Sequence, residues 1–188
     1  MMIETIKYTE YHLFLWLNSF HNSFWDTVMY WVTYRFTWIP LYLFIIYYLF
    51  AVIKKNAWYQ LLFILISVGL SDRVTSGLMK PYFQRFRPCH DPEIQNFVHV
   101  VGGCGGQYGF VSSHAANSFA LALAFSFINK KNPKLNYFLF IWAILVSYSR
   151  IYVGVHYPTD LVIGALMGII ITWSIYLLSI KFTNILLT

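Results

Sequence analysis

The sequence predicts an all-α protein, a polytopic membrane bundle of about six transmembrane helices. Hydrophobic residues make up 59% of the 188 residues and the mean hydropathy is +0.57, which is too apolar for a soluble domain with an ordinary core. Apolar segments also recur along the chain at lengths close to the ~20 residues that cross a bilayer. Each segment should be helical, because hydrocarbon offers backbone groups no other partner.

Five segments have the length and composition of membrane spans. They are residues 36–53, 57–79, 113–128, 135–153 and 159–181. A sixth segment, 12–34, is interrupted at Asn22 and Ser23, and it either spans the bilayer or lies in its interface. Ser23 and Asp26 have the spacing of a capping box, which predicts a helix start there. No linker or fixed repeat divides the sequence, so we expect a single domain over residues 1–188.

The distribution of lysine predicts the orientation in the membrane. The short turns 54–56 and 129–134 contain five lysines and no acidic residue, and Lys181 ends the last span on the same side. Cytoplasmic loops are enriched in Lys and Arg, so this side is predicted to be cytoplasmic. Alternation of the spans then places residues 80–111 and 150–158 on the opposite side. Because the basic residues fall at helix ends, the net charge of +6 predicts no nucleic-acid partner.

The same alternation brings three polar clusters to one end of the bundle. Their sequences are KPYFQRFRP at 80–88, VSSH at 111–114 and SRIYVGVHYPTD at 149–160. Arginine side chains and the N-terminus of a helix are typical of a site for a dense anion such as phosphate, and Ser112 or Ser113 is a natural N-cap there. Asp160 can bond one ring nitrogen of His156 and leave the other free to attack phosphorus, with His114 as the acid.

These clusters resemble, in order and spacing, the three-part signature of the type 2 phosphatidic acid phosphatase family, also called lipid phosphate phosphatases. The matching parts are Lys80, six residues and Arg87-Pro88; Ser112-Ser113-His114; and Ser149-Arg150, five residues, His156, three residues and Asp160. The resemblance runs from the span at 57–79 to the end of the chain. One departure is the second part, which in the family usually reads Pro-Ser-Gly-His and here reads VSSH from Val111.

The resemblance implies a metal-independent phosphatase with a six-helix membrane core and no cofactor. It implies that His156 is the phosphorylated nucleophile, that Asp160 orients it, and that His114 is first general acid and then base. The residues implied to hold the phosphate are Lys80, Arg87, Ser112, Ser113 and Arg150.

Small bacterial members of this family often act on undecaprenyl pyrophosphate, and the size of this chain is similar to theirs. We therefore expect an undecaprenyl diphosphatase of the bacterial inner membrane, with its active site facing the periplasm or the exterior. The partner would be a membrane lipid phosphate, and lipid A, phosphatidylglycerophosphate and phosphatidate are alternative substrates. Two rival interpretations are a metal site, disfavoured by the nearby cations, and a transporter or channel, disfavoured because the charges cluster at one face.

Further residues carry smaller predictions. Arg85 lies off the family pattern and is predicted to be an interfacial anchor. Asp72 should be paired, and Arg73 lies two helical turns before Lys80, which predicts that it supports the site from the same face. Gly164 and Gly168 have a spacing typical of close helix packing.

The loop at 80–111 holds both cysteines of the chain. Cys89 and Cys104 are predicted to form a disulfide, because the loop is expected outside the cytoplasm; two unpaired thiols are the alternative. The run GGCGGQYG at 102–109 lacks the strand and the Lys-Ser/Thr of a phosphate-binding loop, so that function is not expected.

Overall fold

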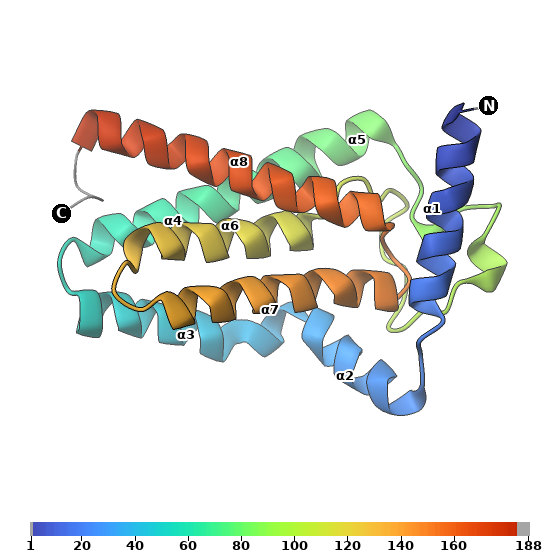
Figure 1. Cartoon of the computed structure of the whole chain (residues 1–188), viewed down its shortest axis with the longest axis horizontal. Helices are drawn as coiled ribbons and strands as arrows, with labels where there is room; N and C mark the ends of the chain where they lie inside the picture. The colour runs from blue at the N-terminus through green and yellow to red at the C-terminus, as the bar shows by residue number, and fades with distance from the viewer. Residues whose placement is uncertain (1, 184–188) are drawn as a thin grey trace.

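The computed structural model describes residues 2–183, and within them the chain is a bundle of helices with no strand beyond one isolated bridge (Figure 1). The α-helices are α1 (Met2–Asn18), α2 (Ser23–Thr33), α3 (Ile39–Tyr47), α4 (Ala57–Asp72), α5 (Lys80–Phe83), α6 (Ser113–Ile128), α7 (Pro133–Tyr152) and α8 (Pro158–Thr183). Short 3₁₀ helices are η1 (Arg35–Trp38), η4 (Pro88–His90) and η5 (Gln95–Phe97), and the π-helical segments are η2 (Tyr48–Ile53) and η3 (Arg73–Met79). The predicted all-α fold class is confirmed.

Within the described residues, four continuous helical stretches are long and apolar enough to cross a membrane. They are Arg35–Ile53, Ala57–Phe83, Pro133–Tyr152 and Pro158–Lys181. The helix α6 is shorter, with 16 residues, and is also apolar. These five elements agree with the five predicted spans to within a few residues. The protein is therefore an integral membrane protein.

The segment 12–34 is not one helix. The helix α1 ends at Asn18 and α2 begins at Ser23, and α1 runs across the end of the bundle (Figure 1). The predicted capping box is wrong: the N-cap is Asn22, whose side-chain oxygen accepts a hydrogen bond from the Trp25 amide at 3.0 Å. The Asp26 carboxylate instead accepts a hydrogen bond from the Tyr152 hydroxyl at 2.8 Å. A better cap one residue earlier and a partner on α7 explain the difference.

The helix α6 occupies the centre of the bundle and packs against α4, α7 and α8. Small residues allow the closest of these contacts. A Cβ atom placed on Gly168 would lie 2.2 Å from the carbonyl oxygen of Ala116, and one placed on Gly164 would lie 2.5 Å from that of Ser112. The predicted close packing is confirmed, and it fixes the N-terminal end of α8 beside the N-terminal end of α6.

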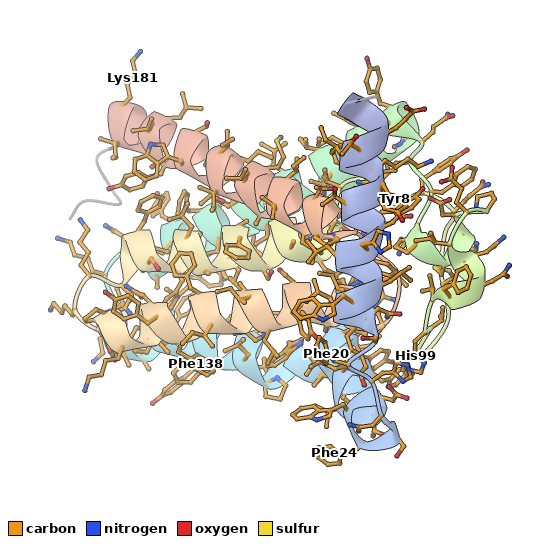
Figure 2. All side chains as sticks on the ribbon, turned by 45° about the vertical axis from the view of Figure 1, so that its right-hand side comes forward. Tyr8, Phe20, Phe24, His99, Phe138 and Lys181 are labelled. Atoms are coloured by element: carbon orange, nitrogen blue, oxygen red, sulfur yellow. A yellow bond between two sulfur atoms is a disulfide. The ribbon has the colours of Figure 1, made fainter. Side chains whose placement is uncertain are left out.

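The outer surface of the bundle is rich in large apolar side chains. Phe24 projects away from the helices, and Phe138 on α7 is 52% exposed (Figure 2). This surface is the one expected for helices that face lipid. Lys181 and the lysine-containing turns lie at the end of the bundle opposite to the loop 84–112 (Figure 1).

Candidate active site

The three polar clusters meet at one end of the bundle, as predicted. They lie where α5 ends, α6 begins, α7 ends and α8 begins, beside the loop that connects α5 to α6 (Figure 1).

A buried histidine and aspartate form the centre of this end. His156 lies in the turn between α7 and α8 and is 1% exposed, and Asp160 in the first turn of α8 is 0% exposed. The Nδ1 atom of His156 lies 3.3 Å from Oδ2 of Asp160, which also accepts a hydrogen bond from the Tyr157 amide at 3.0 Å. Pro158 opens α8 and sets this turn. The pairing through Nδ1 leaves the Nε2 atom as the outer nitrogen of the ring.

The N-terminus of α6 lies against this pair. Ser112 is the N-cap, because its Oγ atom accepts a hydrogen bond from the Ala115 amide at 3.4 Å, and its own amide donates to the Asp160 carbonyl at 3.0 Å. Ser113 accepts a hydrogen bond from Nζ of Lys80 at 3.3 Å. The VSSH sequence therefore still builds a capped helix start, and it joins the first and third polar clusters.

Positive charge surrounds His156. Burial, followed by the charges of Arg150, Arg87, Lys80 and Arg85, holds the pKa of His156 well below its usual value of 6.5. The ring is therefore neutral at neutral pH. The Nε atoms of Arg87 and Arg150 are buried and have no hydrogen-bond partner among the described residues, although Nη1 of Arg150 donates to Thr33.

Buried donors without partners are costly, so these two guanidinium groups fit a site for an acceptor-rich ligand.

The loop before α6 approaches this centre closely at Gly109. A Cβ atom placed there would lie 3.1 Å from Cγ of Arg87, 3.3 Å from Oδ2 of Asp160 and 3.4 Å from Nδ1 of His156. Gly109 therefore allows the backbone to lie directly against the histidine and aspartate. The sequence contains no signal for this role, since Gly109 ends a run of glycines that resembles a flexible loop.

Arg85 is a site residue that the sequence prediction missed. Instead of anchoring at the interface, it donates a hydrogen bond from Nη1 to Oδ1 of Asp160 at 2.9 Å. The sequence contains no local signal for this role, because Asp160 and Glu10, the two acidic partners of Arg85, each lie 75 residues away along the chain.

The prediction for Asp72 is confirmed, and the prediction for Arg73 is wrong. Asp72 is paired, as predicted, because it accepts a hydrogen bond from the Asn117 side chain at 2.9 Å. Arg73 does not support the site: it is exposed, and its side chain lies against Gly77. The segment from Arg73 to Met79 is π-helical, so the α-helical spacing that would place Arg73 above Lys80 does not apply.

Two cavities meet at His114. The first, of about 480 Å³, is mainly apolar and reaches into the bundle between α3, α4, α6 and α7, with Ser113 and His114 among its lining residues. The second, of about 390 Å³, includes His114 and Arg150 together with Tyr30 and the loop at 101–103. His114 therefore lies between a space suited to a lipid chain and a space suited to a polar group.

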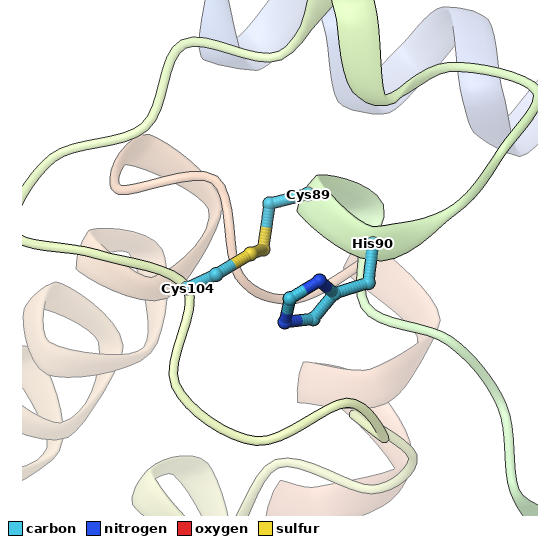
Figure 3. A group of neighbouring side chains, drawn as sticks. All are labelled: Cys89, His90 and Cys104. Atoms are coloured by element: carbon cyan, nitrogen blue, oxygen red, sulfur yellow. A yellow bond between two sulfur atoms is a disulfide. The ribbon is translucent and has the colours of Figure 1, made fainter.

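Cys89 and Cys104 are joined by a disulfide, as predicted (Figure 3). The bridge holds together two parts of the loop, immediately after Arg87-Pro88 and within the glycine run. His90 lies beside it, which gives the three residues the arrangement of a metal-ligand group. Because the two sulfur atoms are bonded to each other, only the His90 ring can act as a ligand in this state.

The fold, together with the similarities to known proteins that follow, defines a class: the chain is an integral membrane lipid phosphatase. It belongs to the PAP2 superfamily, whose family model matches residues 56–184. The lipid A 4'-phosphatase of Bacteroides thetaiotaomicron is 36% identical over 189 residues, which cover 97% of this chain and 82% of that protein. The undecaprenyl-diphosphatase BcrC of Bacillus subtilis is 35% identical over 80 residues, or 43% of this chain and 39% of that protein.

The solved structure of Aquifex aeolicus LpxE has a similar fold. Its TM-score is 0.66 at 25% identity, and the match covers 88% of this chain and 93% of that one.

Proposed function

We propose that this protein removes a phosphate group from a lipid A-type glycolipid through a phosphohistidine intermediate. The similarity to a lipid A 4'-phosphatase over 97% of the chain supports this substrate. On this proposal residues 1–188 act as one domain.

The proposed reaction has two displacements at phosphorus. The Nε2 atom of His156 attacks the phosphate while Asp160 accepts the hydrogen bond of the opposite ring nitrogen, and the bond from phosphorus to the lipid oxygen breaks. His114 gives its proton to that oxygen. His114 then takes a proton from water, whose oxygen attacks the phosphohistidine, so that inorganic phosphate leaves and His156 is restored.

Five side chains hold the phosphate oxygens in this proposal. They are Lys80, Arg87, Ser112, Ser113 and Arg150. Their positive charge and the N-terminus of α6 compensate the negative charge of the transferred group, so the chemistry needs no metal ion.

One observation carries the proposal most strongly. The buried Nε atoms of Arg87 and Arg150, which have no hydrogen-bond partner in residues 2–183, occur in the same site as a buried, neutral His156. A structural histidine and aspartate pair would need no such donors. A phosphate group supplies acceptors for both guanidinium groups and an electrophilic atom for the histidine.

The membrane setting supports a lipid substrate. The apolar cavity reaches from His114 into the part of the bundle that lies within the bilayer, so an acyl chain can remain in an apolar environment while its phosphate reaches the site. Because the lysine-containing turns lie at the opposite end, we place the site on the periplasmic or exterior side of the bacterial inner membrane.

Undecaprenyl pyrophosphate, the substrate expected from chain size, is the second candidate. Relatives with that activity in their names match at most half of the chain, which is weaker support than for lipid A. Phosphatidylglycerophosphate and phosphatidate are the remaining comparison substrates.

The test is release of phosphate by the purified protein from all four lipids, in the presence of a chelator and with or without vanadate. We expect lipid A to be the preferred substrate, with hydrolysis that survives the chelator and is blocked by vanadate. Preference for the polyprenyl pyrophosphate would refute the substrate proposal. Activity lost to the chelator would refute the metal-independent mechanism, and no hydrolysis of any lipid would favour a transporter.

A further inference from the structure

Three parts of the chain that are distant in sequence meet at the guanidinium group of Arg85. Its Nη1 atom donates to Oδ1 of Asp160 at 2.9 Å and to the Thr159 hydroxyl at 2.8 Å, both at the start of α8. Its Nη2 atom donates to Oε2 of Glu10, which lies on α1. Arg85 therefore connects the crossing helix α1 with the carboxylate that contacts His156.

The surroundings of Arg85 fix its position further. The guanidinium carbon lies 4.2 Å from the centre of the Tyr157 ring, which is a cation–π contact. The Tyr157 hydroxyl is itself held by Asp91 at 2.8 Å. Glu10 also binds α8 directly, because its Oε1 atom accepts hydrogen bonds from the amide and the hydroxyl of Thr159. The group is thus held from α1, from α8 and from one face of an aromatic ring.

This arrangement distinguishes Arg85 from the two other arginines of the site. Arg87 and Arg150 each have a buried Nε atom without a partner in the part of the chain that the structure describes, whereas both terminal nitrogens of Arg85 donate to oxygen atoms of the protein. Arg85 therefore directs three of its five N–H donors at oxygen atoms of Asp160, Thr159 and Glu10. Its contacts are directed at the aspartate side of the histidine pair.

The effect on Asp160 follows from its burial. A carboxylate with no exposed surface needs a compensating charge and hydrogen bonds to both oxygens. Arg85 supplies the charge and occupies Oδ1, so Oδ2 is turned towards Nδ1 of His156 and the Tyr157 amide. Loss of this contact would leave the carboxylate able to rotate or to take up a proton, and His156 would lose the partner that orients its ring.

We propose that Arg85 is a positioning residue for His156 and Asp160, and that Glu10 of α1 holds Arg85 in its productive place. This inference rests on the proposed role of His156 as the nucleophile. It adds α1 to the active site, although α1 lies outside the residues 56–184 that match the family model.

The chain provides a matched control for the contribution of α1. Lys7 of α1 forms an ion pair with Glu93 in the loop between α5 and α6, and both side chains are well exposed. The Lys7–Glu93 pair and the Glu10–Arg85 pair both join α1 to the loop between α5 and α6. Of these two pairs, only Glu10–Arg85 also contacts Asp160. A mutation in the Lys7–Glu93 pair therefore tests the docking of α1 alone, and a mutation in the Glu10–Arg85 pair also tests the position of Asp160.

The experiment measures kcat, KM and Tm for the purified full chain and for E10Q, R85K and E93Q. At metal sites, mutation of a residue that supports a ligand lowers metal affinity or activity by roughly 10–100-fold. We expect kcat of R85K to fall by a similar factor and kcat of E10Q to fall by about 10-fold. KM should change less than about 2-fold, because in this proposal Arg85 acts on Asp160 and the phosphate is held by other residues. E93Q should keep the kcat of the wild type.

Wild-type kcat in both E10Q and R85K would overturn the inference while leaving the proposed function intact, and so would equal losses of kcat in E10Q and E93Q. A loss that appears only in KM would also overturn it, because it would make Arg85 a substrate ligand. A wild-type protein without phosphatase activity would instead refute the proposed function.

Discussion

Replacement of Gly164 by alanine tests whether contact between α6 and α8 sets the geometry of the site. The added Cβ atom would lie 2.5 Å from the carbonyl oxygen of Ser112. An ordinary contact needs about 3.4 Å, so the two helix ends must separate by about 0.9 Å. The displaced residue is the N-cap of α6, next to Ser113 and His114, whereas His156 and Asp160 lie at the start of α8.

A misplacement of about 1 Å between reacting groups can cost about 100-fold in rate. We therefore expect G164A to lower kcat by about two orders of magnitude, and overpacking to destabilise the fold by about 1–3 kcal/mol. Phosphate release in detergent and thermal unfolding measure the two effects. The matched control is G69A on α4, where an added Cβ atom meets no atom of the described residues within 4 Å.

G69A should retain the wild-type kcat and should be no less stable, since alanine favours helix formation over glycine. The reasoning is refuted if G164A has the wild-type kcat, because the helix contact would then not determine the position of the site. It is also refuted if G69A loses as much activity as G164A.

Three further predictions concern the proposed mechanism and the loop. H114A should lower kcat by roughly 10²–10⁴-fold, and a substrate with a good leaving group should recover part of the loss; equal losses for good and poor leaving groups would exclude the role as acid. Because the pKa of His156 is lowered, its neutral form persists below pH 6.5, so the acid limb of kcat/KM should lie below that pH; a limb above pH 6.5 would contradict this. Reductant should lower the Tm of the wild type but not that of C104S, since a disulfide that spans 15 residues contributes roughly 3 kcal/mol; an unchanged wild-type Tm would contradict a stabilising bridge.

Patterns along single spans made much of the fold predictable. The apolar segments have nearly the bounds of the observed helices, because length and hydropathy determine which residues can lie in a bilayer. Local capping preferences likewise narrowed the N-cap of α6 to Ser112 or Ser113, and the structure shows Ser112. The meeting of the three polar clusters required only that successive spans alternate in direction.

The errors come from contacts that no local pattern encodes. Arg85 binds Glu10 and Asp160, and each of these partners is 75 residues away in sequence. Arg73 was misplaced because a π-helical segment changes the spacing of side chains along the helix. The interruption at Asn22 and Ser23 was expected, but the cap was assigned to the wrong residue, because Asp26 binds Tyr152 of α7 and Asn22 caps α2.

The central claim is that phosphate passes through His156, and trapping of the intermediate tests it most directly. The purified protein is mixed with a lipid A-type substrate that carries labelled phosphate and is quenched during turnover, and the labelled residue is identified by mass analysis. We predict label on His156 in the wild type and no labelled protein in H156A, which should also lack turnover. Label retained by H156A, or label on a different residue of the wild type, would contradict the claim.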